Sequence, residues 1–129
     1  MAITVEFRTD IFPAYENEEG ESVNGFIGRR CVEWVRDGLP RYGQETLSIC
    51  PEDWGWLVFL EETFPFWIGC NNMGCGDDGL PEYHLIIVAE PRNRLFRKKI
   101  NTRPAMDKAV MALHELISNE PKILNPRWG

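Results

Sequence analysis

The spacing of apolar and polar positions along the chain predicts five β-strands. Residues 3–8 alternate between apolar and polar side chains, as a half-buried strand does. Four further apolar segments are expected to be strands, at residues 46–50, 54–61, 64–70 and 83–89. Short links between consecutive strands favour an antiparallel meander.

Apolar residues at spacings of three and four predict a first helix. Its stripe consists of Val23, Phe26, Ile27, Cys31, Trp34 and Val35. Ser22 stands at the N-cap position, and Gly38 stands where the helix should end. We expect Trp34 to be buried against the sheet, because it shares the stripe with Cys31.

A second helix is predicted near the C-terminus, with Thr102 as its N-cap. Its buried face is expected to contain Met106, Ala109, Val110, Leu113 and Ile117. Pro121 and Pro126 predict an extended tail after this helix. Residues 1–129 therefore form a single α+β domain of order β-α-β-β-β-β-α. About five strands make one antiparallel sheet, with two helices packed on one face.

The central strands are apolar on both faces, which is unusual for an antiparallel sheet covered on one side. By alternation, Trp54 and Trp56 share one face, whereas Leu57 and Phe59 lie on the other. Two helices of about 15 residues cover only one such face. Sheet curvature, the C-terminal tail, a ligand or a second subunit can cover the other. We predict a homodimer through it, with contacts from some of the residues Trp56, Leu57, Phe59 and Trp67.

Residues 71–82 are rich in Gly, Asn and Asp and predict a long, mobile hairpin loop. Long loops of this kind often have a function, so Asp77 and Asp78 are candidate binding residues. The glycines precede a strand rather than a helix, and no Lys-Ser or Lys-Thr pair follows them. The segment is therefore not a phosphate-binding loop.

The net charge of the 129 residues is −6 at pH 7, which argues against general nucleic-acid binding and favours a basic protein partner. Acidic residues gather within residues 10–21, and basic residues gather within residues 91–104. The two stretches are either solvated loops that face each other or, on the basic side, a site for an anion. Arg97, Lys98 and Arg103 are the candidates for that site.

No apolar run reaches the roughly 20 residues that a membrane span requires, and no signal-peptide pattern opens the sequence. We therefore expect a cytoplasmic protein with reduced cysteines and no membrane partner.

The cysteines and histidines indicate neither a metal site nor catalysis. Four residues separate Cys70 from Cys75, where a zinc knuckle has two, and His84 and His114 form no paired motif. His84 is a candidate base for Cys70 or Cys50 on a neighbouring strand. Two buried strand residues are the favoured interpretation, so no catalytic residue, metal or cofactor is predicted.

The most distinctive strings are Pro51-Glu52-Asp53-Trp54-Gly55-Trp56, Trp67-Ile68-Gly69-Cys70 and Leu95-Phe96-Arg97-Lys98-Lys99-Ile100. Together they resemble a group of small bacterial proteins with an E-D-W-G-W strand opening. The resemblance spans about residues 20–128 and implies no activity, cofactor or binding residue. It implies a genetic context on mobile elements or beside toxins. Physically, Gly55 leaves a bare patch on which a helix residue is expected to pack.

Two functional hypotheses follow. The first is a non-catalytic protein-binding module, of immunity or antitoxin type or accessory to a mobile element. The second is a binding domain or enzyme for a small anionic ligand, with a pocket between the aromatic sheet face and segment 71–82. The candidate binding residues are Trp54, Trp56, Trp67, Asp77, Asp78, Arg97, Lys98 and Arg103.

Overall fold

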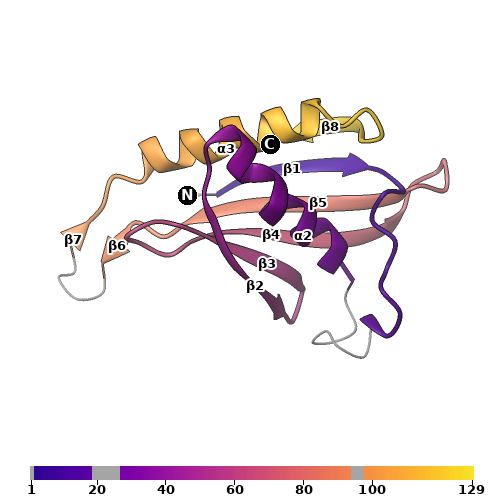
Figure 1. Ribbon diagram of the computed structural model, residues 1–129, viewed down its shortest axis with the longest axis horizontal. Coiled ribbons are helices and arrows are strands. Elements are labelled where there is room, and N and C mark those ends of the chain that lie inside the picture. Colours follow the sequence, from indigo (N-terminus) through magenta and orange to yellow (C-terminus); the bar gives the residue numbers. More distant parts are fainter. Residues whose placement is uncertain (1, 19–26, 94–97) are drawn as a thin grey trace.

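In the computed structural model, which describes residues 2–18, 27–93 and 98–129, six strands form one antiparallel sheet. Its order is β2-β3-β4-β5-β1-β8 (Figure 1). The strands are β1 (Ala2–Arg8), β2 (Thr46–Glu52), β3 (Gly55–Leu60), β4 (Phe66–Cys75), β5 (Pro81–Ala89) and β8 (Leu124–Trp128). The predicted meander is confirmed as β2 to β5, and β1 lies beside β5.

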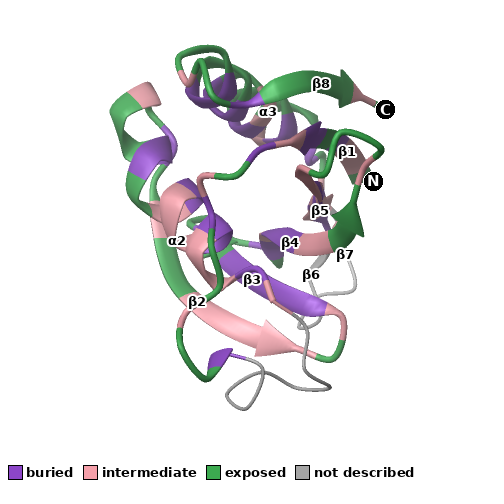
Figure 2. Ribbon diagram, turned by 90° about the vertical axis from the view of Figure 1, so that its right-hand side faces the viewer, coloured by how far each residue is buried: buried purple, intermediate pink, exposed green. Residues whose placement is uncertain are grey.

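Two helices of the described residues, α2 (Arg29–Gly38) and α3 (Arg103–Ser118), pack on the same side of this sheet. The sheet curls around them, so we call the side with the helices the concave face and the other side the convex face (Figure 2). A short 3₁₀ helix, η2 (Leu39–Tyr42), follows α2, and a small hairpin of β6 (Arg92–Asn93) and β7 (Lys98–Lys99) precedes α3. The predicted α+β class is thus confirmed.

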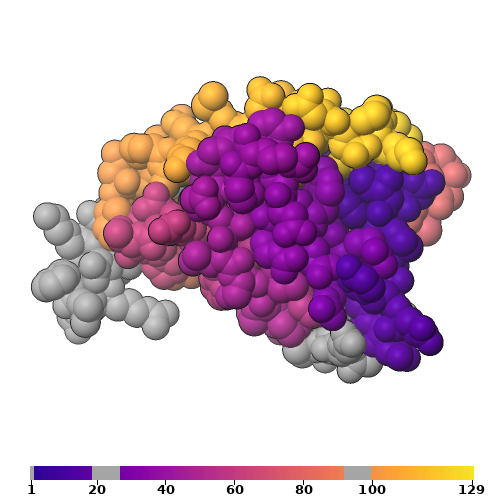
Figure 3. Space-filling model, viewed as in Figure 1, coloured from indigo at the N-terminus to yellow at the C-terminus, as the bar shows by residue number. Residues whose placement is uncertain are grey.

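The core lies between the helices and the concave face. It combines Val32 and Val35 of α2 with Met106 and Leu113 of α3, and all four are fully buried. The sheet contributes alternate residues of its strands, among them Val58, Ile68, Leu85 and Ile87. In the space-filling view, the purple residues of α2 occupy the middle of the face, and the orange to yellow residues of α3 and β8 lie along its upper edge (Figure 3). None of the described helices is long and apolar enough to span a bilayer.

Helix α2 begins later than its apolar stripe predicts. Ser22, Val23 and Phe26 lie outside the described residues, and Ile27 precedes the helix. Gly28 is the N-cap, with a φ of 149° that L side chains rarely adopt, and a Cβ there would lie 3.0 Å from the carbonyl oxygen of Cys70. The close approach to β4 therefore sets the start of the helix.

The cap of α2 comes from Glu18 rather than from the predicted serine. One carboxylate oxygen of Glu18, Oε2, accepts hydrogen bonds from the backbone N–H groups of Gly28 (2.7 Å) and Arg29 (3.1 Å). Its other oxygen, Oε1, accepts from Tyr15 N–H at 3.1 Å, and the residue is only 1% exposed. A buried carboxylate at a helix N-terminus accepts hydrogen bonds from backbone N–H groups that have no partner within the helix. Its negative charge also interacts favourably with the positive end of the helix dipole.

Trp34 is only half-buried, so the prediction that it is buried is wrong, although its side chain packs against the core cluster. The buried face of α2 is made of Cys31, Val32 and Val35, and Trp34 lies at its edge. Its indole instead contacts the ring of Phe12, with centroids 5.2 Å apart. The segment before the helix therefore contributes to the cover of this side chain.

The predicted loop 71–82 is largely a continuation of the sheet. Strand β4 runs on to Cys75 and β5 starts at Pro81, with Asn71 opposite His84. A bulge between Asn72 and Cys75 shifts the register before a tight turn. The long loop prediction is therefore wrong, because turn-forming residues here serve a bulge and a short turn.

The C-terminal tail is extended, as the prolines predict, and it adds a sixth strand. β8 pairs with β1, where Val5 lies opposite Trp128 and Glu6 opposite Arg127. Pro126 is tolerated because β8 is an edge strand of the sheet.

Candidate functional site

A second apolar cluster covers the middle of the convex face. Register places Phe59, Trp67 and Val88 side by side across three strands, and Leu57, Gly69 and Ile86 form the next row. None of these residues belongs to the core between the sheet and the helices. Phe59 is 38% exposed, whereas Leu57 beside it is only 4% exposed. The cluster thus has a buried base and an accessible surface.

Trp54 joins this convex cluster, although alternation along the strand predicts the opposite face. β3 begins at Gly55, so Trp54 lies in the preceding turn and escapes the alternation. Its indole stacks on that of Trp67, with centroids 5.7 Å apart and an interplanar angle of 27°. The rings meet over Gly69, where a Cβ would lie 2.7 Å from Trp54 Cζ3. A glycine in mid-strand beside a tryptophan was the sequence signal for this contact.

Gly55 itself has a different neighbour from the one predicted. A Cβ at Gly55 would lie 2.5 Å from the carbonyl oxygen of Cys70 in β4. The space left by the missing side chain of Gly55 is therefore occupied by the backbone of the adjacent strand β4 and not, as expected, by a helix residue.

Beside the stacked indoles lies a hollow of about 290 Å³, which we call the indole hollow. Its walls are Trp54, Trp67, Asn71, His84 and Ile86. The amide nitrogen of Asn71 donates to Met73 Sδ at 3.5 Å, whereas its Oδ1 is buried without a hydrogen-bond partner. The hollow thus combines aromatic faces, one apolar side chain, an imidazole and an amide whose oxygen is buried without a partner.

Trp56 lies on the concave face, 5% exposed, and does not join Trp54 and Trp67. The guanidinium of Arg29 stands 5.5 Å from its ring centroid. Trp56 is consequently unavailable as a contact on the outer sheet face.

Asp77 and Asp78 lie in the turn between β4 and β5 and do not line the indole hollow. Asp78 faces Arg8, with 3.3 Å between its Oδ2 and the arginine Nε, and its Oδ1 accepts from Leu80 N–H at 3.1 Å. In this position Asp78 stabilises the turn.

The three basic candidates are not brought to the indole hollow. Arg103 is in the first turn of α3 and pairs with Asp107 at 3.1 Å. Lys98 belongs to strand β7, and Arg97 lies outside the described residues. The described walls of the hollow therefore contain no lysine or arginine for an anion.

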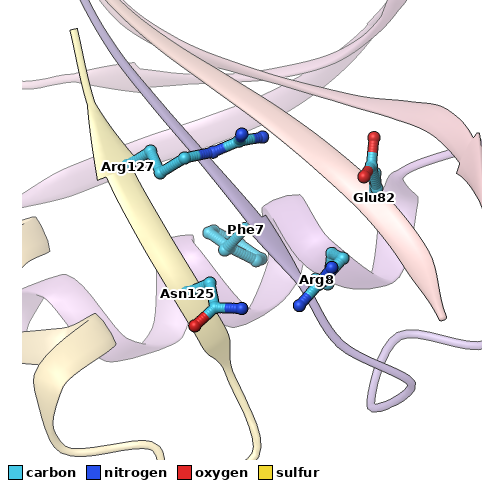
Figure 4. A pocket seen from close by; sticks show the side chains of 5 residues that line it. All are labelled: Phe7, Arg8, Glu82, Asn125 and Arg127. Atoms are coloured by element: carbon cyan, nitrogen blue, oxygen red, sulfur yellow. The ribbon is translucent and has the colours of Figure 1, made fainter. Parts of the chain in front are cut away.

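A second cavity, of about 250 Å³, opens beside the irregular pairing of β1 with β8 (Figure 4). Its walls are Phe7, Arg8, Glu82, Asn125 and Arg127. Arg127 pairs with Glu6 at 3.2 Å, just as Arg8 pairs with Asp78, so acids already balance both guanidinium groups. Asn125 adopts a φ of 51°, which suits the irregular pairing of β8 with β1.

The structure does not bring His84 beside Cys70 as a base for its thiol. Cys70 faces the concave core, whereas His84, opposite Asn71, lies on the convex face. Burial, followed by a hydrogen bond with Cys70, raises the pKa of the Cys31 thiol. Burial also raises the pKa of Cys50, and Glu52 adds to the effect. Such thiols are poor nucleophiles at neutral pH.

The described residues contain no group of three or more His, Cys, Asp or Glu side chains able to hold a metal ion. The chain matches no protein-family model, no curated protein and no solved structure.

Proposed function

We propose that this protein is a non-catalytic binding domain that engages a basic protein through the convex face of its sheet. The observation that carries the proposal is the stacked pair of Trp54 and Trp67, which lies opposite the face that the helices use. Aromatic side chains clustered outside the core are typical of interface centres.

Acidic residues at both ends of strand β3 support a basic partner. Glu52 and Asp53 precede Trp54 at one end, and Glu61 and Glu62 follow the strand at the other. Lys108 shares a surface hollow with Glu45, Glu61 and Glu62, so the acids outnumber the base there. With the net charge of −6, this arrangement attracts cations to the apolar cluster and speeds encounter. This combination suits a domain that blocks a basic toxin or nuclease.

The alternative to a basic partner is a second copy of the chain that binds the convex face to form a homodimer. Pairing two copies would bring like-charged strand ends together, which opposes a tight dimer at low salt. An anionic ligand is disfavoured by the net charge of −6, and the described walls of the indole hollow contain no lysine or arginine to bind it.

The proposal is tested by selecting displayed random peptides on the wild-type protein. We expect the enriched peptides to combine lysine or arginine with apolar residues. They should lose binding to Phe59→Asp, although this variant adds a negative charge, because the apolar contact is broken. Met111→Asp is the matched control, since Met111 is 69% exposed on α3. Peptides that bind Phe59→Asp as well as wild type, or that are acidic, would overturn the proposal.

A further inference from the structure

We propose that the indole hollow is a pocket for an arginine side chain of the partner. This inference rests on the proposed function and specifies which side chain of the partner would enter the hollow. The hollow adjoins the accessible apolar cluster, so a residue of a docked protein reaches it without opening the fold.

The aromatic walls favour a flat cation. An indole face carries negative charge density, and a guanidinium is planar, weakly hydrated and stacks on it, whereas an ammonium keeps its water more strongly. The same fold already places arginines over rings elsewhere. Arg30 lies 3.9 Å from the ring centroid of Tyr15, and Arg29 lies 5.5 Å from that of Trp56.

The amide of Asn71 supplies the polar part of the site. Its nitrogen is engaged with Met73, so Oδ1 is the atom without a partner. A guanidinium offers five N–H donors in one plane. Because Oδ1 is buried, we expect a guanidinium on the indoles to reach it only after the soft terminal amide torsion of Asn71 rotates, which gives up the contact with Met73 Sδ.

Charge selects arginine over a neutral or anionic group. The walls carry no described lysine or arginine, and the acidic pair Glu52 and Asp53 directly precedes Trp54 in the chain. Acidic residues next to Trp54 in the chain favour the approach of a cation, and among the described wall residues only His84 can itself carry a positive charge.

The test uses three capped pentapeptides with a single arginine, lysine or citrulline among glycines and serines. Citrulline has the planar shape of arginine without its charge. Binding is followed by NMR on the indole N–H signals of the ¹⁵N-labelled protein, assigned with Trp54→Phe and Trp67→Phe. We expect the arginine peptide to shift the Trp54 and Trp67 signals saturably, with an affinity about two- to fivefold above that of either other peptide. The Trp34 and Trp128 signals are internal controls and should not move.

Asn71→Leu separates the amide contact from the aromatic one. This variant keeps a side chain in the wall but removes the amide acceptor. The ratio of the affinities for the arginine and lysine peptides should therefore fall towards one. Equal binding of arginine and citrulline, or no saturable shift at Trp54 and Trp67, would overturn the arginine pocket. If selected peptides still depend on Phe59 in that case, the proposed function stands and only the anchor is wrong.

Discussion

The indole of Trp54 lies directly on the backbone of Gly69, where a Cβ would stand only 2.7 Å from Trp54 Cζ3. This contact holds a turn residue of the β2–β3 hairpin on strand β4 and forms one wall of the indole hollow. The pair therefore couples the stability of the sheet to the shape of the candidate site.

Gly69→Ala should displace the Trp54 indole and destabilise the protein by about 1–3 kcal/mol, the usual cost of overpacking. Urea titration gives the free energy of unfolding, and tryptophan fluorescence should shift to longer wavelength as Trp54 becomes wetter. In a Trp54→Ala background the same substitution should cost much less, because the clash is gone. Equal costs in the two backgrounds would show that the two residues do not interact.

Glu18→Gln should destabilise the protein by about 2 kcal/mol, because charge-assisted hydrogen bonds to the start of α2 become neutral ones. Glu16→Gln, two residues away and exposed, is the matched control and should change stability by less than about 0.5 kcal/mol. The measurement is chemical denaturation of the three proteins. Indistinguishable midpoints would mean that the buried carboxylate does not stabilise the helix.

Trp56→Ala should destabilise the protein by about 3–5 kcal/mol, as expected for emptying a large aromatic site in the core. Trp34→Ala should cost less, about 1–3 kcal/mol, because Trp34 is half-buried and packs on Phe12. Denaturant titrations of both variants give the comparison. A larger loss in the free energy of unfolding for Trp34→Ala than for Trp56→Ala would contradict the burial of Trp56 in the core and the half-buried position of Trp34.

The oligomeric state should depend on salt. We expect a monomer at low ionic strength, because acidic strand ends of two copies repel each other, and a growing dimer fraction at about 1 M salt, where that repulsion is screened. Sedimentation equilibrium measures the mass, and Phe59→Asp should remove any dimer that uses the convex face. A tight dimer at low salt that Phe59→Asp dissociates would make a second copy the occupant of this face.

The purified protein should contain no stoichiometric zinc, and a chelator should leave its melting temperature unchanged. Cys70 faces the core and His84 the opposite side of the sheet, while Cys75 lies at the far end of β4. These three residues therefore do not converge on one ion. Elemental analysis that finds one zinc per chain would refute this prediction.

The periodicity of the sequence by itself determined most of the elements. Helix α3 spans Arg103–Ser118, directly after the predicted N-cap Thr102, and the meander strands lie close to their predicted ranges. These features follow from local repeats of apolar residues, which a single segment displays without its neighbours. The apolar character of the second sheet face was visible for the same reason.

Only the tertiary structure decided which residues meet. Trp54 crosses to the convex face because β3 starts one residue after it, at Gly55, and because Gly69 leaves space on a different strand. Glu18 caps α2 from outside the helix, and the tail becomes a strand by pairing with β1 at the other end of the chain. Each of these contacts joins segments that no local pattern connects, and so each depends on how the sheet brings distant backbone together.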